Sequence, residues 1–257
     1  MAFASVGSLG TTANKTADQF LSTHTTTATA EAGNLVVVSF ASDNPGTTVD
    51  EGVEGNEFVA CTDSAGNTYT KALEWDFDGG SASQSGATVV IYFCKLTTEL
   101  TSGGTISVQS ANAFTHDASA FSVWEFTCSS TATIAVEATN HAVVISDVMA
   151  DLDATTANIE CLRIYADAAE ANTTTGAPVA TGFTDWGVTA TTGGGSAANM
   201  GIRACHKIST GTSDICQPTN TLDCDHSTIY VALKEVSTTP SSIAFTPNSY
   251  FLPLIVR

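Results

Sequence analysis

The first residues whose type and spacing suggest chemistry are three carboxylates at alternate positions. Glu74, Asp76 and Asp78 lie in the segment Glu-Trp-Asp-Phe-Asp. Successive side chains of a strand point to opposite faces, so these three would share one face. Such spacing is typical of oxygen ligands for calcium, and Asp76 and Asp78 are the candidate ligands. The complete twelve-residue calcium loop is absent, so the sequence assigns no metal.

A second acidic group lies just upstream of these carboxylates. We favour a solvated acidic loop as the interpretation of both groups. Paired carboxylates around an aromatic residue would also suit a glycosidase, with Trp75 and Trp186 stacking on sugar. Trp124 lies in an alternating segment and is expected in the core. The second group comprises Asp50, Glu51, Glu54 and Glu57.

The five histidines, His24, His116, His141, His206 and His226, are isolated from one another in the sequence. Only His116-Asp117 and Asp225-His226 place an acid directly beside a histidine, and adjacent strand residues point to opposite faces. We therefore expect polar surface histidines. No Gly-x-Ser-x-Gly string and no glycine-rich phosphate loop with a following lysine is present. We assign no catalytic residue and expect neither enzymatic activity nor a cofactor.

The chain has seven cysteines and no Cys-x-x-Cys pair of the kind found in zinc and redox sites. Cys94, Cys161 and Cys205 lie in apolar, strand-like runs and are expected to be buried. Cys216 and Cys224 flank a polar loop and are a candidate disulfide. The expected synthesis in a cytoplasm, which is reducing, argues against this bond.

The charge is strongly acidic, with 26 acidic against 8 basic residues and a net charge of −18. Binding to nucleic acid or to an anionic membrane requires a basic surface, so we expect neither partner. The first residues lack the basic and apolar regions of a signal peptide, and we expect synthesis in a cytoplasm.

The elements that would position these residues are short strands separated by Gly, Asn, Asp, Ser and Thr turns. Alternation or continuous apolar runs predict ten to twelve strands, the number typical of an antiparallel β-sandwich, jelly-roll-like in order. Residues 166–172 would allow a helical turn or a strand extension. The main predicted segments are 35–40, 62–70, 87–96, 105–109, 121–126, 133–137, 159–166, 183–188, 200–208 and 229–236.

The composition changes near Pro240. Residues 1–236 are predicted to form a single sandwich domain, and residues 237–257 an extended, Pro-punctuated C-terminal arm. An apolar arm is unfavourable in water, so it packs on its own domain or on a neighbouring subunit, with the connector favouring the neighbour. Its candidate partner-binding residues are Phe245, Tyr250, Phe251, Leu252, Leu254 and Ile255.

Several of these strings resemble a β-sandwich domain family of tailed-bacteriophage virion proteins and related bacterial surface proteins. The most distinctive is the turn Asp-Ser-Ala-Gly-Asn-Thr-Tyr at residues 63–69, and the resemblance spans roughly residues 28–236. It departs from the family pattern in its cysteines, its acidic insertion near residues 50–57 and its arm. The other strings are residues 33–37, 91–95, 100–104, 122–126, 182–186 and 229–234.

The resemblance implies a structural role in a virion, with capsid decoration or cementing as the first expectation. The implied partners are the chain itself, in a closed homo-oligomer such as a trimer, and a major capsid or other virion protein. The implied location is the virion, after synthesis in the host cytoplasm. The alternative is a tail-fibre or cell-surface module that binds glycan.

Overall fold

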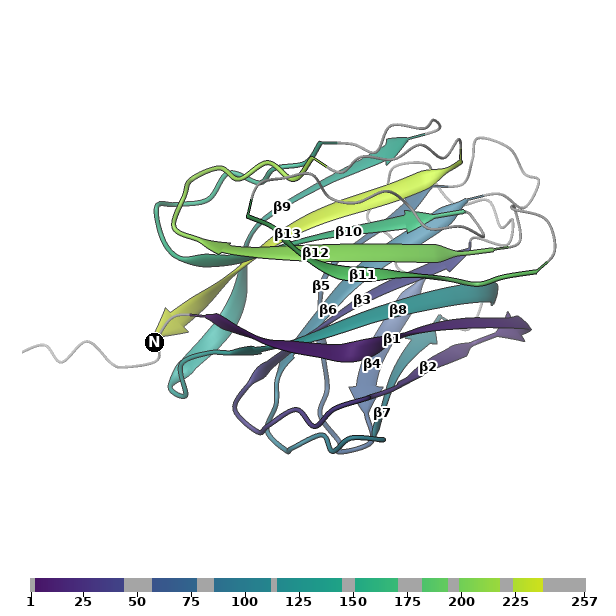
Figure 1. Cartoon of the computed structure of the whole chain (residues 1–257), viewed down its shortest axis with the longest axis horizontal. Helices are drawn as coiled ribbons and strands as arrows, with labels where there is room; N and C mark the ends of the chain where they lie inside the picture. The colour runs from purple at the N-terminus through teal and green to yellow at the C-terminus, as the bar shows by residue number, and fades with distance from the viewer. Residues whose placement is uncertain are drawn as a thin grey trace, which may run out of the picture.

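The chain forms an all-β structure. The computed structural model describes residues 3–43, 57–77, 86–111, 115–144, 151–170, 182–193, 199–217 and 224–237. These residues form no helix, and so none that could span a membrane. The strands in Figure 1 are β1 (Ala4–Gln19), β2 (Leu21–Thr25), β3 (Leu35–Asp43), β4 (Phe58–Asp63), β5 (Thr70–Phe77), β6 (Ala87–Lys95), β7 (Thr105–Ser110), β8 (His116–Thr127), β9 (Ala132–Val144), β10 (Cys161–Ala169), β11 (Thr184–Ala190), β12 (Gly201–Ser209) and β13 (His226–Ser237).

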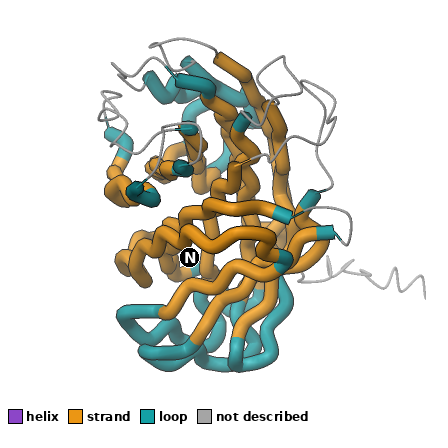
Figure 2. The backbone as a smooth tube through the Cα atoms, turned by 90° about the vertical axis from the view of Figure 1, so that its right-hand side faces the viewer, coloured by secondary structure: helices purple, strands orange, loops and turns teal. Residues whose placement is uncertain are grey.

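The strands make three layers, seen in Figures 1 and 2. The central sheet has the order β1-β8-β3-β6-β5, one outer sheet has the order β11-β12-β10-β13-β9, and a small outer sheet has the order β2-β7-β4. All neighbouring strands are antiparallel. The antiparallel sandwich predicted from the sequence is therefore confirmed.

The central sheet is buried on both faces because its middle strands are apolar at successive positions. Val37 and Ile91 point into the core shared with the large outer sheet. Val36 and Tyr92 point into the core shared with the small sheet. An unbroken apolar run, which marked β3 in the sequence, is the pattern that such a doubly covered strand needs.

The turn between β4 and β5 carries the most distinctive sequence motif, and its function here is structural. Asp63 Oδ1 accepts hydrogen bonds from the backbone N–H groups of Ala65 and Asn67. Asn67 Oδ1 accepts the N–H groups of Thr97 and Thr98. The motif thus closes one turn and ties it to the next, as an Asx turn does.

The ends of the two large sheets that meet near Gly86 define what we call the loop end of the sandwich. There Asp43 and Phe77 both pair with Ala87, and His226 pairs with Ala169. The N–H of Gly86 donates to the Glu170 carboxylate across the two sheets. Loops at one end of a rigid sandwich are a common place for binding groups.

Two strands were not predicted from the sequence, and the strand order does not confirm the expected jelly roll. The sequence analysis did not predict β1 and β2, because β1 is an edge strand with a mostly exposed surface and few apolar residues. The possible helical turn after residue 166 is strand through Ala169. Jelly-roll order is not confirmed, because β9–β13 all remain in one sheet. The domain boundary at residue 236 stays a prediction, and the arm lies outside the described residues.

Candidate functional site

A buried acidic pocket lies where the small sheet meets the open edge of the central sheet, and we call it the acidic pocket. It contains Glu57, directly before β4, and Glu74 and Asp76 on the edge strand β5. One ligand atom from each of the three lies within 4.8 Å of the other two. The side chains are almost completely buried, with exposed fractions of 8% for Glu57, 0% for Glu74 and 1% for Asp76.

Glu74 is the carboxylate of the pocket that accepts backbone N–H groups and pairs with a lysine. Its Oε1 accepts the backbone N–H of Glu57 at 2.7 Å and that of Phe58 at 3.2 Å. Its Oε2 pairs with the Lys71 ammonium. These donors stabilise the ionised form and fix Glu57 and the start of β4 against β5.

Glu57 and Asp76 lack such donors. Oε2 of Glu57 and both carboxylate oxygens of Asp76 are buried with no hydrogen bond of acceptable length and angle. The same holds for the hydroxyl of Thr88, the residue directly opposite Asp76 on β6. Directly opposed residues of an antiparallel pair share a face, so Thr88 points to the side of Asp76. Unpartnered buried oxygens are rare and need an explanation.

The electrostatics of the pocket follow from this burial. Desolvation raises the pKa of both Glu57 and Glu74 to about 8 and the pKa of Asp76 to about 6. A single lysine faces the three carboxyl groups. The pocket therefore reduces its negative charge either by taking up protons or by binding a cation.

The sequence found part of this pocket. Asp76 was a calcium candidate and lies in it, whereas Asp78 lies outside the described residues. The expectation of a solvated loop is wrong for Glu57, Glu74 and Asp76, which are buried. Their convergence depends on the pairing of β4 with β7 and on the packing of two sheets, which residue spacing along the chain does not reveal.

A second polar cluster at the loop end joins a thiol, an imidazole and a carboxylate. Cys224 Sγ lies 3.2 Å from Nε2 of His226, and Nδ1 of His226 lies 3.1 Å from Oδ1 of Asp167. Burial alone would lower the pKa of His226, but the adjacent Asp167 carboxylate raises it, to about 10. The Cys224 thiol contacts the His226 imidazole, which in turn contacts the Asp167 carboxylate. This is the order of groups found where an imidazole activates a thiol. The adjacent Asp225, noted in the sequence, is not the acid that aligns His226.

Four histidines were expected at the surface and are instead buried: His24, His116, His206 and His226. Each has at least one ring nitrogen in hydrogen-bond contact inside the sandwich. Nδ1 of His24 contacts Thr12 Oγ1, His116 lies between Ser22 and Ser110, and His206 accepts the indole N–H of Trp186. Burial lowers the pKa of His116 and of His206 to about 4, so both are uncharged at neutral pH.

The tryptophans considered for sugar stacking face inward. Trp75 is 9% and Trp186 is 4% exposed. Trp75 stacks on His141, and Trp186 stacks on Trp124, which packs against the main core as expected. The stacking surface proposed for a glycan from these two residues is therefore absent.

The candidate disulfide is not formed in this structure, in which Cys216 and Cys224 are both free thiols. Cys216 pairs through its backbone with Leu152, which turns its thiol inward to lie 3.4 Å from that of Cys205. Cys224 instead contacts His226. Cys94, Cys161 and Cys205 are buried, as expected.

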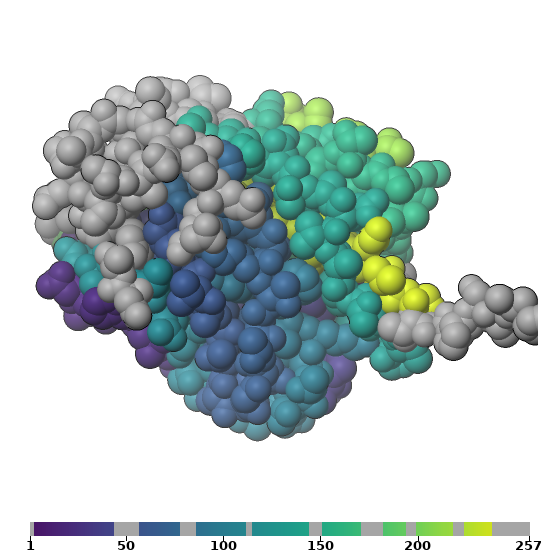
Figure 3. All heavy atoms as spheres, turned by 180° about the vertical axis from the view of Figure 1, so that it is seen from behind, coloured from purple at the N-terminus to yellow at the C-terminus, as the bar shows by residue number. Residues whose placement is uncertain are grey.

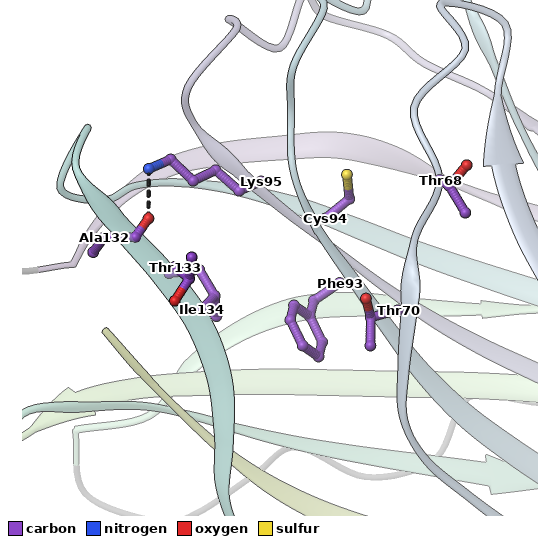
Figure 4. Close-up of a pocket in the computed structure, with 8 residues that line it drawn as sticks. All are labelled: Thr68, Thr70, Phe93, Cys94, Lys95, Ala132, Thr133 and Ile134. Carbon is purple, nitrogen blue, oxygen red and sulfur yellow. Dashed lines mark hydrogen bonds between the residues drawn. The ribbon is translucent and has the colours of Figure 1, made fainter. Parts of the chain in front are cut away.

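A shallow groove lies at the end of the sandwich opposite to Cys224. It has a volume of about 240 Å³ and runs between the edge strands of the two large sheets (Figure 4). The Lys95 ammonium crosses one end of it and donates to the Ala132 carbonyl at 2.7 Å. Figure 3 shows this face, with the blue β4–β6 region beside the teal β9. The lining residues are Thr68, Thr70, Phe93, Cys94, Lys95, Ala132, Thr133 and Ile134.

The groove adjoins the point where the arm begins. Ser237, the last residue of β13, pairs with Ala132 in the groove wall. The six partner-binding candidates of the arm, Phe245, Tyr250, Phe251, Leu252, Leu254 and Ile255, lie outside the described residues. No family model matches this chain, and no curated protein has a matching sequence.

Proposed function

We propose that the chain is a non-enzymatic structural subunit of a tailed-phage virion, in first place a capsid decoration or cement protein. The observation that carries the proposal is that the described residues form an antiparallel β-sandwich with extensive cores between its sheets, the fold that the resemblance implies. Phe40, Ile91 and Leu162, for example, are each 0% exposed. The apolar residues of the arm are unfavourable in water, and we expect them to bind a partner.

The place where the arm begins supports a contact between copies. A groove of about 240 Å³ accommodates one large side chain, and Phe93 and Ile134 give it apolar walls. Phe245 lies eight positions after Ser237. When extended, this stretch spans roughly 26 Å, which would place Phe245 beyond the groove beside its own Ser237. We therefore assign the groove to the arm of a neighbouring copy in a closed ring, in which every copy gives and receives one arm.

A second surface suits the contact with a shell protein. Leu21 and Val59 are 52% and 58% exposed, on strands that flank β7 in the small sheet, and Phe20 beside them is 49% exposed. Large exposed apolar side chains that lie together mark interaction surfaces. The acidic surface does not suit nucleic acid or an anionic membrane, in line with a protein partner.

The test compares the full chain with a chain that ends at Ser237. Light scattering after size exclusion is expected to give an oligomer for the full chain and a monomer for the truncated chain, with equal melting temperatures. Thr133→Arg places a long charged side chain over the groove and is expected to dissociate the full-length oligomer likewise. A truncated chain of unchanged mass would overturn the role of the arm.

The location in a particle is tested by counting copies. Mass spectrometry of gradient-purified particles should find this chain at a number comparable to that of the major shell protein. A few copies per particle would instead support a tail or fibre protein. Absence from particles would reject the virion role, and binding to a glycan array by the full chain would then support the surface-module alternative.

A further inference from the structure

The acidic pocket contains four buried oxygen atoms that make no hydrogen bond of acceptable length and angle, although Asp76 interacts with both Glu57 and Thr88. They are Oε2 of Glu57, Oδ1 and Oδ2 of Asp76, and Oγ1 of Thr88. Thr88 and Asp76 are 0% and 1% exposed, and they come from neighbouring strands. Leaving one buried polar group poorly paired costs about 1–3 kcal/mol, so three such groups in one place are unfavourable unless something binds them.

We propose that this pocket is a calcium site, with Glu57, Asp76 and Thr88 as ligands and Glu74 as the positioning carboxylate. All the available donors are oxygen atoms, which favours a hard divalent cation over zinc or copper. Two ligands of one calcium ion, each at about 2.4 Å, are at most about 4.8 Å apart. The three carboxyl groups meet that limit, since their ligand atoms lie within 4.8 Å of one another.

Calcium suits the pocket better than magnesium. Magnesium usually retains several of its water molecules and needs nearly ideal octahedral geometry, whereas calcium accepts irregular shells of protein oxygens. A pocket whose oxygen atoms are all buried favours the ion that exchanges water for protein ligands. The two free oxygens of Asp76 also allow bidentate binding, which is common for calcium.

The ion would join all three strands that meet there. Glu57 precedes β4 of the small sheet, Asp76 is on β5, and Thr88 is on β6 of the central sheet. Glu74 already holds the start of β4 through two backbone N–H groups, so it sets the distance between Glu57 and Asp76. Calcium binding is therefore expected to stabilise the attachment of the small sheet to the central one.

The first test is titration of the purified, chelator-treated full chain with calcium chloride in a calorimeter. One saturable site is expected. In thermal unfolding, calcium at about 100 times its dissociation constant should raise the melting temperature by about 5 °C. Sodium chloride of equal ionic strength controls for screening of the net charge of −18. An equal shift with sodium, or no saturable site, would overturn the proposal, and a larger shift with magnesium would overturn the choice of ion.

Two variants test the ligands, and one controls for charge. Asp76→Asn removes a buried, unpartnered charge, so the ion-free variant should be at least as stable as the wild type while the calcium shift disappears. Thr88→Val keeps the side-chain shape and should weaken calcium binding about tenfold. Glu99→Gln removes an exposed acid and should leave the shift intact. A full calcium shift in both Asp76→Asn and Thr88→Val would reject this pocket as the site.

Discussion

The Asp167 carboxylate and the His226 imidazole lie 3.1 Å apart, and neither side chain is exposed to solvent. They come from the neighbouring strands β10 and β13 and lie on the face of the large outer sheet that points away from the main core. Burial raises the pKa of Asp167, and the carboxylate raises the pKa of His226 to about 10. The pair therefore holds a proton on the imidazole far above the pH at which a free histidine loses it.

Replacing Asp167 tests this pairing. Asp167→Asn should lower the pKa of His226 from about 10, because burial still lowers it while the largest raising contribution, that of the Asp167 carboxylate, is lost. The loss of the pair should destabilise the domain by about 2–4 kcal/mol at pH 7. Imidazole titration by NMR and urea unfolding measure the two effects. Asp117→Asn, in an exposed acid, is the control, and a His226 titration that stays near 10 would contradict the pairing.

The same pair predicts a pH dependence with a definite sign. The folded-state pKa of His226 is raised, so its contribution to stability is complete below about 6.5 and is lost as the pH rises towards 10. Wild type and Asp167→Asn should therefore differ most in unfolding free energy near pH 6 and converge near pH 10. Urea melts at these two values check this, and a constant difference would show that the effect is steric.

The contact between Cys224 and His226 predicts a reactive thiol. Five of the seven cysteines are buried, and Cys128 and Cys224 are partly exposed. The Cys224 thiol lies 3.2 Å from Nε2 of His226, and an adjacent histidine is a common feature of reactive cysteines. Cys224 should react with iodoacetamide at pH 7 at least ten times faster than Cys128, and peptide mapping by mass spectrometry measures both rates in one sample.

Cys128 is the internal control for exposure, because it is partly exposed like Cys224. Burial raises the pKa of the Cys128 thiol. His226→Gln should reduce the rate at Cys224 about tenfold and leave the rate at Cys128 unchanged. Equal rates at the two cysteines in the wild-type protein would show that the imidazole does not activate Cys224.

The sequence predicted those strands whose pattern is local. The unbroken apolar run of β3 and the alternation of apolar and polar residues in β8 identified both segments as strands. Successive side chains of a strand point to opposite faces, so their burial can be read from neighbouring residues. The turn at Asp63 was equally local, since an Asx turn uses residues two to four apart. Strand β1 was missed because its surface is mostly exposed and its partner β8 lies about a hundred residues away.

The polar sites depended on contacts that residue spacing does not encode. Glu57 and Asp76 meet only because two sheets pack together, and Asp167 meets His226 across 59 residues of chain. The histidines were expected at the surface because each is isolated from the others in the sequence. Their serine, threonine and tryptophan partners come from other strands, so only the folded structure reveals that burial is compensated by hydrogen bonds.

Gly10 sits at an irregularity of β1 where a side chain is excluded. Its φ is +115°, and an added Cβ would lie 3.1 Å from both the His24 ring and Thr27. Gly10→Ala should therefore destabilise the domain by about 1–3 kcal/mol in urea unfolding. Gly7→Ala is the control for backbone strain, because its φ of +157° also disfavours a side chain while nothing lies within 4 Å of that position. Equal stability of the two variants would contradict the crowding at Gly10.

Glu170 links the two large sheets and should make the domain less stable in alkali. Burial and the nearby Asp225 charge raise its pKa to about 8, while Gly86 donates to one of its oxygens. The folded state therefore holds a proton between about pH 4.5 and 8 that the unfolded chain releases, so stability falls as the pH rises through this window.

Glu170→Gln keeps an acceptor for Gly86 and removes the titration. The variant should match the wild type at pH 4 and exceed it by about 2 kcal/mol at pH 9, less than the full pKa shift corresponds to because the site can relax. Urea unfolding at both pH values gives the difference in unfolding free energy between the variant and the wild type. The contributions of other titrating groups are common to both proteins and cancel in this difference. Glu99→Gln, at an exposed position, should follow the wild type throughout. If Glu170→Gln does the same, the carboxyl at Glu170 is already solvated, and another buried acid must account for any loss of stability in alkali.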